Sequence, residues 1–322
     1  MNRGFWDRLK KPFFVLAPLA DVTDASFRRV IAKYGKPDVM YTEFVSADGL
    51  VLAPDSGRKK LLADLLYDES ERPIVAQFFS GKPEMIAKAA AVARELGFDG
   101  VDINMGCPDR SIEKQGAGAA HIKNPKLAKE IILAAREGAG DLPVSVKTRL
   151  GYNKDELEEW LPAILEAKPA LVTIHARTRK EMSKVPARWE RVKRAVSIRD
   201  EVAPETLIAG NGDLIDLDDA RAKAQESGAD GAMLGRAIFG NPWLFSYSNV
   251  LENIGIRERL EIMVEHTKLF EELLPHKSFA LMKKHYKAYV KDFDGAAELR
   301  GDLMNAESAR EVEGVVNSYL LK

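Results

Sequence analysis

The sequence predicts an α/β fold, namely a (β/α)8 TIM barrel followed by an all-helical C-terminal domain. Three observations support this: the length of 322 residues, short apolar runs alternating with helical segments, and no strand pattern after about residue 247. Apolar strands alternating with helices indicate a parallel sheet covered on both faces, and eight units over about 230 residues suit a closed barrel. A doubly wound open sheet is the alternative, but no G-x-G-x-x-G motif follows the first strand.

The expected strands are eight short apolar runs, at 13–17, 38–42, 73–78, 100–104, 143–147, 170–175, 206–210 and 231–234. Helices are expected between them at 24–34, 83–96, 125–137, 154–167, 189–199 and 217–227. Asp24 is a candidate N-cap for the first helix, which Gly35 would close, and Pro83 begins the second helix. The apolar residues of the stretch 48–66 follow neither the helical nor the strand spacing.

The residues after 247 show a helical spacing of apolar side chains, of which the clearest run is Leu260, Met263, Val264, Thr267 and Phe270. Helices are expected at 257–274 and 279–291, with two shorter ones further on. Because this segment is too long for one capping helix, we expect two domains, residues 1–247 and 248–322.

The composition predicts a folded globular protein, since 46% of the residues are hydrophobic and 30% are charged. The single cysteine excludes an internal disulfide and a cysteine-rich zinc site, and it fits a reducing compartment. No apolar run approaches the roughly 20 residues of a spanning helix, and residues 1–11 lack a signal-peptide core. We therefore expect a cytoplasmic protein without a membrane partner, acting as a monomer.

The net charge of −1 does not indicate nucleic-acid binding, but two stretches are locally basic. Between residues 177 and 199 only Glu181 and Glu190 oppose the basic side chains, and residues 276–291 contain five lysines and no acid. Such runs are usually solvated faces. Two of them on one enzyme would also fit a polyanion.

Polar side chains follow most of the expected strands, and in a barrel these carboxyl ends form the active-site rim. The residues at these positions are Pro18, Glu43, Gln77, Asn104, Lys147, His175, Asn211, Gly235 and Arg236. Lys147 could stabilise negative charge on a ring or an enolate, or could form a salt bridge. His175 could be an acid, a base, a hydrogen-bond donor or a structural residue.

The loops after the last two strands favour a phosphate site. Asn211-Gly212-Asp213 follows the seventh strand and Gly235-Arg236 follows the eighth, which is where barrels frequently bind phosphate. Glycine permits close backbone approach, and arginine offers a charged fork to phosphate oxygens. A phosphorylated cofactor fits this rim, whereas the scattered histidines and the lack of an H-E-x-x-H motif give no metal site.

Cys107 lies where the fourth strand breaks into a loop at Gly106 and Pro108. Loops on a rigid scaffold carry many catalytic residues. Free cysteine is also a common buried filler. Position alone does not decide between the two.

Six motifs in order resemble the FMN-dependent tRNA-dihydrouridine synthases, over about residues 13–245. They are LAPLADVTD at 16–24, DINMGCPD at 102–109, VKTRLG at 146–151, IHARTR at 174–179, NGD at 211–213 and GRA at 235–237. Other flavin barrels share several of these motifs, but the ordered set is specific.

The resemblance implies roles for individual residues. Pro18, Leu19 and Ala20 would lie along the flavin, and Gln77, Lys147 and His175 would contact its ring system. The remaining cofactor residues would hold the ribityl phosphate end: Asn211, Gly212, Asp213, Gly235 and Arg236. Asn104 and Arg177 would meet the substrate, and Cys107 would be the proton donor.

The implied activity is reduction of the C5–C6 double bond of specific uridines in tRNA, with FMN as the cofactor and NADPH as the electron donor. A thiol that is mostly protonated at neutral pH suits the role of general acid. An FMN barrel acting on a free pyrimidine, such as a dihydroorotate or dihydropyrimidine dehydrogenase, is the alternative. A flavin-free RNA-binding scaffold is a third.

Overall fold

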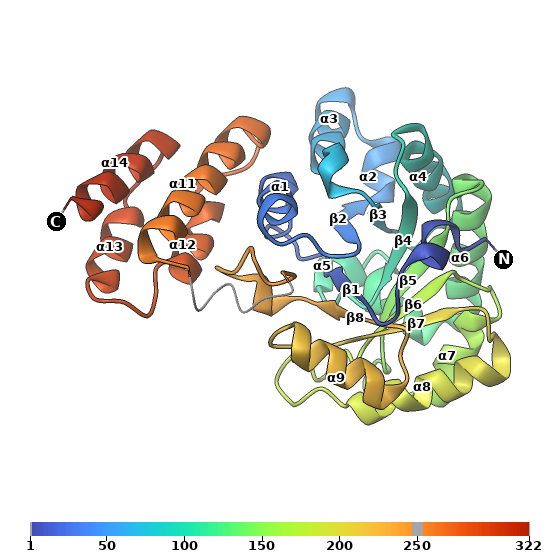
Figure 1. Ribbon diagram of the computed structural model, residues 1–322. Helices are drawn as coiled ribbons and strands as arrows, with labels where there is room; N and C mark the ends of the chain where they lie inside the picture. The colour runs from blue at the N-terminus through green and yellow to red at the C-terminus, as the bar shows by residue number, and fades with distance from the viewer. Residues whose placement is uncertain (1, 247–253, 322) are drawn as a thin grey trace.

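The computed structural model describes residues 2–246 and 254–321, and the described strands form one parallel sheet rolled into a barrel (Figure 1). The strands are β1 (Phe13–Leu16), β2 (Met40–Ser46), β3 (Ile74–Phe79), β4 (Gly100–Met105), β5 (Val144–Arg149), β6 (Leu171–His175), β7 (Leu207–Asn211) and β8 (Gly231–Leu234). From β2 to β8 each strand pairs with its sequence neighbours, and β1 pairs with β8. A parallel bridge between Val15 and Val39 closes the ring. The TIM-barrel prediction is confirmed.

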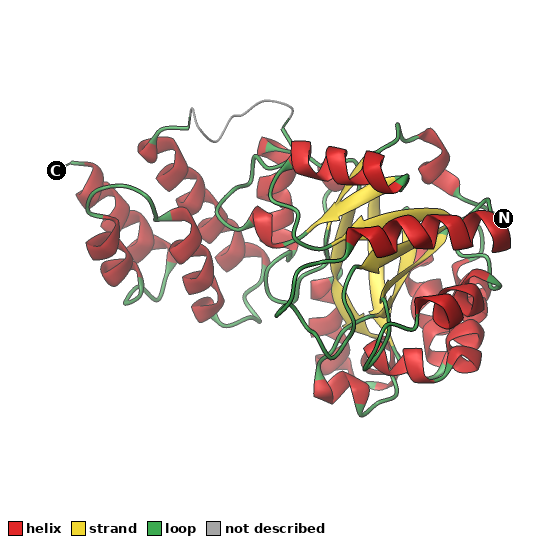
Figure 2. Cartoon of the chain, turned by 90° about the horizontal axis from the view of Figure 1, so that it is seen from below, coloured by secondary structure: helices red, strands yellow, loops and turns green. Residues whose placement is uncertain are grey.

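Helices surround the barrel strands, as the view in Figure 2 shows. They are α1 (Ala25–Tyr34), α2 (Ala47–Leu52), α3 (Asp55–Asp64), α4 (Pro83–Glu95), α5 (Arg110–Glu113), α6 (Pro125–Ala139), α7 (Leu157–Leu165), α8 (Trp189–Val202) and α9 (Leu217–Ser227). The local signals act as expected: the Asp24 carboxylate caps α1 by accepting from the Phe27 N–H, and Pro83 begins α4. Among the described helices, none is long and apolar enough to cross a membrane.

The interior of the barrel is filled from below by apolar side chains. Phe13, Val15 and Met233 belong to this inner cluster, which Phe5 and Trp6 of the short N-terminal 3-10 helix (Gly4–Arg8) extend. A second, larger cluster lies between the strands and the helices. Because the packed layers occupy the lower part of the barrel, its C-terminal mouth is left to hold a ligand.

Two parts of the barrel differ from the sequence prediction. The strand β2 begins at Met40 and ends at Ser46, so Glu43 lies inside the strand rather than at its end. The pairing of β2 with β3 shifts register between Tyr41 and Phe44, which a polar stretch such as Thr42-Glu43 does not indicate in advance. The unassigned stretch 48–66 contains most of α2 and all of α3, and α3 has no buried residue.

The C-terminal segment is helical, as predicted, and packs against α1. Its helices are α11 (Ile256–Leu273), α12 (Lys283–Tyr289), α13 (Ala296–Leu303) and α14 (Ala309–Leu320). His266 of α11 stacks on Phe27 of α1 with ring centroids 4.7 Å apart, and Lys277 Nζ lies 2.6 Å from Glu43 Oε2. The domain boundary predicted at residue 247 lies outside the described residues.

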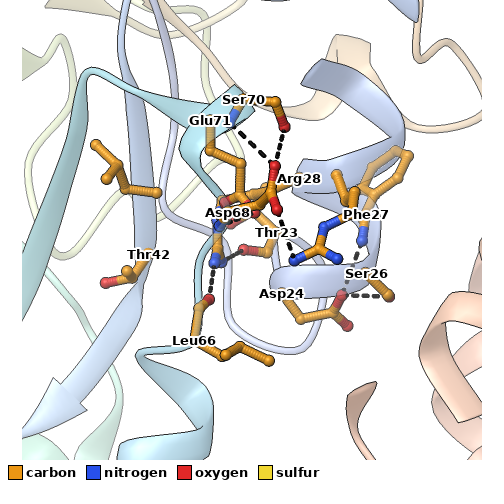
Figure 3. A network of polar contacts seen from close by, with 12 residues as sticks. Thr23, Asp24, Ser26, Phe27, Arg28, Thr42, Leu66, Asp68, Ser70 and Glu71 are labelled. Carbon is orange, nitrogen blue, oxygen red and sulfur yellow. Dashed lines mark hydrogen bonds and ion pairs between the residues drawn. The ribbon is translucent and has the colours of Figure 1, made fainter. Parts of the chain in front are cut away.

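A buried arginine fixes the start of α1, and with it the loop that follows β1 (Figure 3). Arg28 is fully buried, and its Nε donates to Glu71 Oε2 at 2.7 Å. Its other nitrogens donate to the carbonyl oxygens of Thr23 (2.8 Å) and Leu66 (2.6 Å). A buried charge of this kind is tolerated because its donors are satisfied. The Thr23 contact holds the end of a loop that borders the barrel mouth.

Candidate active site

A cavity of about 620 Å³ opens at the C-terminal end of the barrel. Its walls come from most of the strand ends that the sequence assigned to the site. The predicted site residues that line it are Pro18, Leu19, Ala20, Asn104, Cys107, Lys147, His175, Arg177, Asn211, Gly212, Asp213, Gly235 and Arg236. The structure thus brings together residues from both ends of the barrel sequence.

Cys107 lies on a loop that the Asn104 side chain holds in place. Asn104 Oδ1 accepts hydrogen bonds from the backbone N–H groups of Gly106 (3.1 Å) and Cys107 (2.9 Å). On the other side, the Ala119 N–H donates to the Cys107 carbonyl oxygen at 2.9 Å. Burial raises the pKa of the Cys107 thiol above its ordinary value. The thiol is therefore protonated at neutral pH and can donate a proton.

Gln77 lies behind Asn104 and is not among the residues that line the cavity. It is fully buried, its Oε1 accepts from Asn104 Nδ2 at 3.1 Å, and its Nε2 donates to Asp102 Oδ2 at 2.6 Å. Burial raises the pKa of Asp102 to about 6, while hydrogen bonds from Ser145 and Gln77 and the charge of Lys147 oppose the rise. In this arrangement Gln77 supports Asn104 from below, and its expected contact with the flavin ring stays a prediction.

Lys147 presents a cation at the cavity without a fixed partner. Its ammonium makes no hydrogen bond or ion pair among the described residues. Burial, followed by the neighbouring charge of Arg149, lowers its pKa to about 8 against the opposing effect of Asp102. An unpaired, desolvated ammonium at a cavity wall is suited to stabilise an anionic group.

His175 is held as a neutral ring. Arg177 Nη1 lies 3.1 Å from His175 Nε2, and because a guanidinium can only donate, that nitrogen must be the acceptor. The ring proton is therefore on Nδ1. Burial, together with the charges of Arg149 and Lys147, lowers the pKa of His175 well below its ordinary value. His175 is therefore a neutral ring that can donate one hydrogen bond, from Nδ1.

The loops after β7 and β8 form the other end of the cavity. Asp213 accepts hydrogen bonds from Arg177 Nη2 and the Ala187 N–H, and its Oδ1 lies 2.8 Å from Arg236 Nη2. Gly212 has φ +126°, and a Cβ atom there would lie 2.9 Å from the Ala187 Cβ. Only glycine fits this position without strain. The Arg236 side chain is 64% exposed although it is paired with Asp213, so its guanidinium still faces solvent at this end of the cavity.

Arg149 and Asp102 contribute to the site but were not predicted from the sequence. Arg149 lines the cavity, donates from Nε to the Gly106 carbonyl oxygen at 2.7 Å, and so braces the Cys107 loop. Asp102 anchors Gln77 from beneath. The signal was the period of two along a strand, because Arg149 lies two residues after Lys147 and Asp102 two before Asn104, on the same face.

The two basic stretches differ once their partners are known. All six arginines between 177 and 199 form ion pairs, for example Arg191 with Asp155 at 2.8 Å and Arg194 with Glu158 at 2.7 Å. Most of the acids come from distant segments, so the stretch is far less basic than it looked. On α12, Lys283, Lys284 and Lys287 have no ion pair among the described residues.

Comparison with known proteins agrees with the geometry. The family model described as "Dihydrouridine synthase (Dus)" matches residues 15–321. A Bacillus subtilis (strain 168) relative named "Probable tRNA-dihydrouridine synthase 2" is 42% identical, covering 99% of this chain and 97% of its own length. A Staphylococcus aureus (strain MRSA252) relative named "Probable tRNA-dihydrouridine synthase" is 39% identical, covering 99% and 96%.

Solved structures support the fold alone. The chain resembles a 2-naphthoyl-CoA reductase with a TM-score of 0.55 at 14% identity, covering 76% of this chain and 50% of that one. It also resembles the 6-hydroxypseudooxynicotine amine oxidase of Pseudomonas geniculata N1, with a TM-score of 0.53 at 14% identity, covering 86% and 57%. This chain thus spans about half of each of those longer proteins. By its family model and its curated relatives, the chain belongs to the dihydrouridine synthase family.

Proposed function

We propose that this chain is an FMN-dependent enzyme that reduces the C5–C6 double bond of specific uridines in tRNA, with NADPH as the electron donor. The observation that carries the proposal is Cys107, a protonated thiol held by Asn104 at the wall of a large rim cavity. The names of the curated relatives support the substrate class. These names do not favour the free-pyrimidine alternative.

The residues that line the cavity suit FMN, with an apolar wall for the ring system and donors for the phosphate. One wall is the apolar strip from Ala17 to Ala20, against which a flat ring can lie. The far end has Gly212, where the backbone is bare, and the exposed guanidinium of Arg236, both suited to phosphate oxygens. Lys147 would contact the ring system with its unpaired ammonium. When bound, FMN would supply the hydride that uracil reduction requires.

Cys107 would supply the proton for the other carbon of the C5–C6 bond. The proton leaves the thiol Sγ, and the resulting thiolate lies near the Asp109 backbone N–H and the charges of Arg149 and Lys147. These groups stabilise the thiolate, while burial keeps the resting thiol protonated. Asn104 and Arg177 line the same cavity and are proposed to contact the substrate base.

The C-terminal helices would bind the RNA. A uridine stacked inside folded tRNA must turn out of the stack to reach a cavity of this depth. The surrounding phosphates then need cations that are not already paired within the protein. Lys283, Lys284 and Lys287 on α12 meet this condition, whereas the arginines of 177–199 do not.

The test is a reaction of the purified yellow holoprotein with unmodified tRNA transcripts. With NADPH, we expect dihydrouridine to appear in the transcripts by mass spectrometry, and to appear more slowly with NADH. A protein that leaves tRNA unmodified while it turns over free dihydroorotate or uracil would overturn the proposal. A protein purified without flavin absorbance that cannot be reconstituted with FMN would overturn the cofactor assignment.

A further inference from the structure

We propose that Asp102 is a positioning residue that acts through Gln77 and Asn104 on the loop that carries the thiol. The side chains form one directed chain of hydrogen bonds beneath the cavity. Asp102 Oδ2 accepts from Gln77 Nε2 at 2.6 Å, and Gln77 Oε1 accepts from Asn104 Nδ2 at 3.1 Å. The importance of this chain for turnover rests on the proposed function, but its effect on the thiol does not.

The direction of these hydrogen bonds is fixed at both ends of the series. An ionised carboxylate can only accept, so Gln77 must turn its NH₂ toward Asp102 and its carbonyl toward Asn104. At the far end, the backbone N–H groups of Gly106 and Cys107 need an acceptor, which Asn104 Oδ1 supplies. Each amide therefore has one matched orientation. Turning either amide by 180° would place a donor against a donor or an acceptor against an acceptor, which is costly in a buried site.

The negative charge at the base of this series of hydrogen bonds lies in a fully buried position. Asp102 is fully buried, and Ser145 Oγ, 2.6 Å from its Oδ1, is a neutral partner. Burial makes the ionised form of this carboxyl less favourable, which the raised pKa of Asp102 reflects. Groups buried at a cost to stability are typical of functional sites. A negative end polarises the two amides in series, so that Asn104 Oδ1 binds the loop N–H groups more strongly.

Asp102→Asn is the first test, because it keeps the shape and removes the charge. The protein has a single cysteine, so the rate of iodoacetamide alkylation reports on Cys107 alone. We expect alkylation of the full-length protein at pH 7 to become several-fold faster, since a looser loop leaves the thiol more accessible to the reagent. We also expect turnover on tRNA to fall roughly 10- to 100-fold, with KM for tRNA unchanged.

The matched control is Asp38→Asn. Asp38 is also a carboxyl with a pKa raised by burial, and it accepts the Phe14 N–H at 2.7 Å, but it lies at the opposite end of the barrel. Alkylation of Cys107 should be unchanged in this variant. Equal alkylation rates in wild type, Asp38→Asn and Asp102→Asn would overturn the proposal.

The second test reverses the chain. In Asn104→Asp, Gln77 lies between two carboxylates and can satisfy only one with its NH₂, so we expect a lower Tm and altered alkylation. Adding Asp102→Asn restores a matched set in the opposite direction. The new amide at position 102 can donate to the Gln77 carbonyl, and the Gln77 NH₂ can donate to the new carboxylate at position 104.

We expect the double variant to have a higher Tm than Asn104→Asp alone, so that Asp102→Asn raises the Tm more in the Asn104→Asp background than in the wild type. Additive effects of the two substitutions on alkylation and Tm would contradict the proposed series of hydrogen bonds from Asp102 to the Cys107 loop.

The proposed function and the positioning chain can fail separately. An inactive wild type with the expected alkylation pattern would reject the proposed function and keep the positioning chain. Normal tRNA reduction in Asp102→Asn with unchanged alkylation would reject the positioning role of Asp102 and leave the proposed function standing.

Discussion

The barrel mouth and the barrel–tail interface both bury titratable groups, but in different ways. At the mouth, the half-buried His175 has a hydrogen-bond partner that fixes its protonation and direction, and so does the fully buried Asp102 beneath it. At the interface, His266 and His285 are buried among aromatic rings, and neither ring nitrogen of His266 has a hydrogen-bond partner among the described residues. The comparison shows that burial alone makes a neutral, packed ring, whereas directed partners make a group that can serve a reaction.

The same difference appears in the charges. Lys277 of the tail is buried in ion pairs with Glu43 (2.6 Å) and Asp64 (3.2 Å), so it joins two parts of the fold. Lys147 at the mouth has no partner among the described side chains, and its pKa is lowered to about 8. The paired lysine stabilises the docked tail, and the unpaired one is available to a ligand.

The largest expected effect is on uridine reduction, which a substitution at the barrel mouth should slow and one at the barrel–tail interface should not. Cys107→Ala should slow uridine reduction roughly 10²–10⁴-fold, because a positioned general acid is lost. The measurement is single-turnover formation of dihydrouridine. His266→Phe, a change of similar depth at the interface, should keep wild-type activity at pH 7. Full activity in Cys107→Ala would remove the thiol from the mechanism.

The interface should lose stability in acid. Burial lowers the pKa of His266 to about 3, whereas the unfolded chain binds a proton near its ordinary value of 6.5. The stability from this residue is therefore complete above pH 6.5 and is lost as the pH falls toward 3, by about 2 kcal/mol at pH 5. Thermal unfolding between pH 5 and 8 checks this. The decline should be smaller in His266→Phe, and parallel curves for both proteins would contradict it.

A backbone change at the mouth should weaken cofactor binding. Gly212→Ala places a Cβ 2.9 Å from that of Ala187 at φ +126°, and such strain costs about 1–3 kcal/mol, equivalent to roughly 5- to 150-fold in affinity. Titration of the apoprotein with FMN measures the change. Gly301→Ala on α13 is the control, since nothing lies within 4 Å of the added atom. Equal affinities in both variants would show that the β7 loop does not hold the cofactor.

The smallest expected effect concerns Lys147. Because its pKa is about 8, the ammonium loses its proton above that pH, and the affinity for an anionic cofactor should fall about fivefold between pH 8 and 9. Calorimetric titration across this range measures the slope. Lys147→Met should bind more weakly and show no such step. A step that persists in the variant would belong to another group.

Much of the fold could be predicted because apolar runs and caps are local signals. The helix 217–227 and the strand 231–234 have their predicted bounds, and Asp24 caps α1 as expected. The strand β2 was placed too early, because its polar middle is stabilised by partners on β3: the Gln77 N–H donates to Thr42 Oγ1 at 3.1 Å. The helix α3 escaped prediction because it has no buried face.

The sequence identified most of the site residues, but not which of them line the cavity and which lie beneath it. Strand ends identified Asn104, Lys147 and His175, and the structure places all three at one cavity. Whether a strand residue faces the ligand or supports its neighbour depends on register between strands, and Gln77 pairs with Asp102 across β3 and β4. Likewise, no local pattern shows that Arg191 meets Asp155, which lies 36 positions away.

The most direct test of the central claim is a position-by-position map of dihydrouridine in tRNA from cells that lack this chain. The account predicts that dihydrouridine disappears from defined positions, returns with the wild-type chain, and does not return with Cys107→Ala. An unchanged map in the deleted cells, or full restoration by Cys107→Ala, would contradict it.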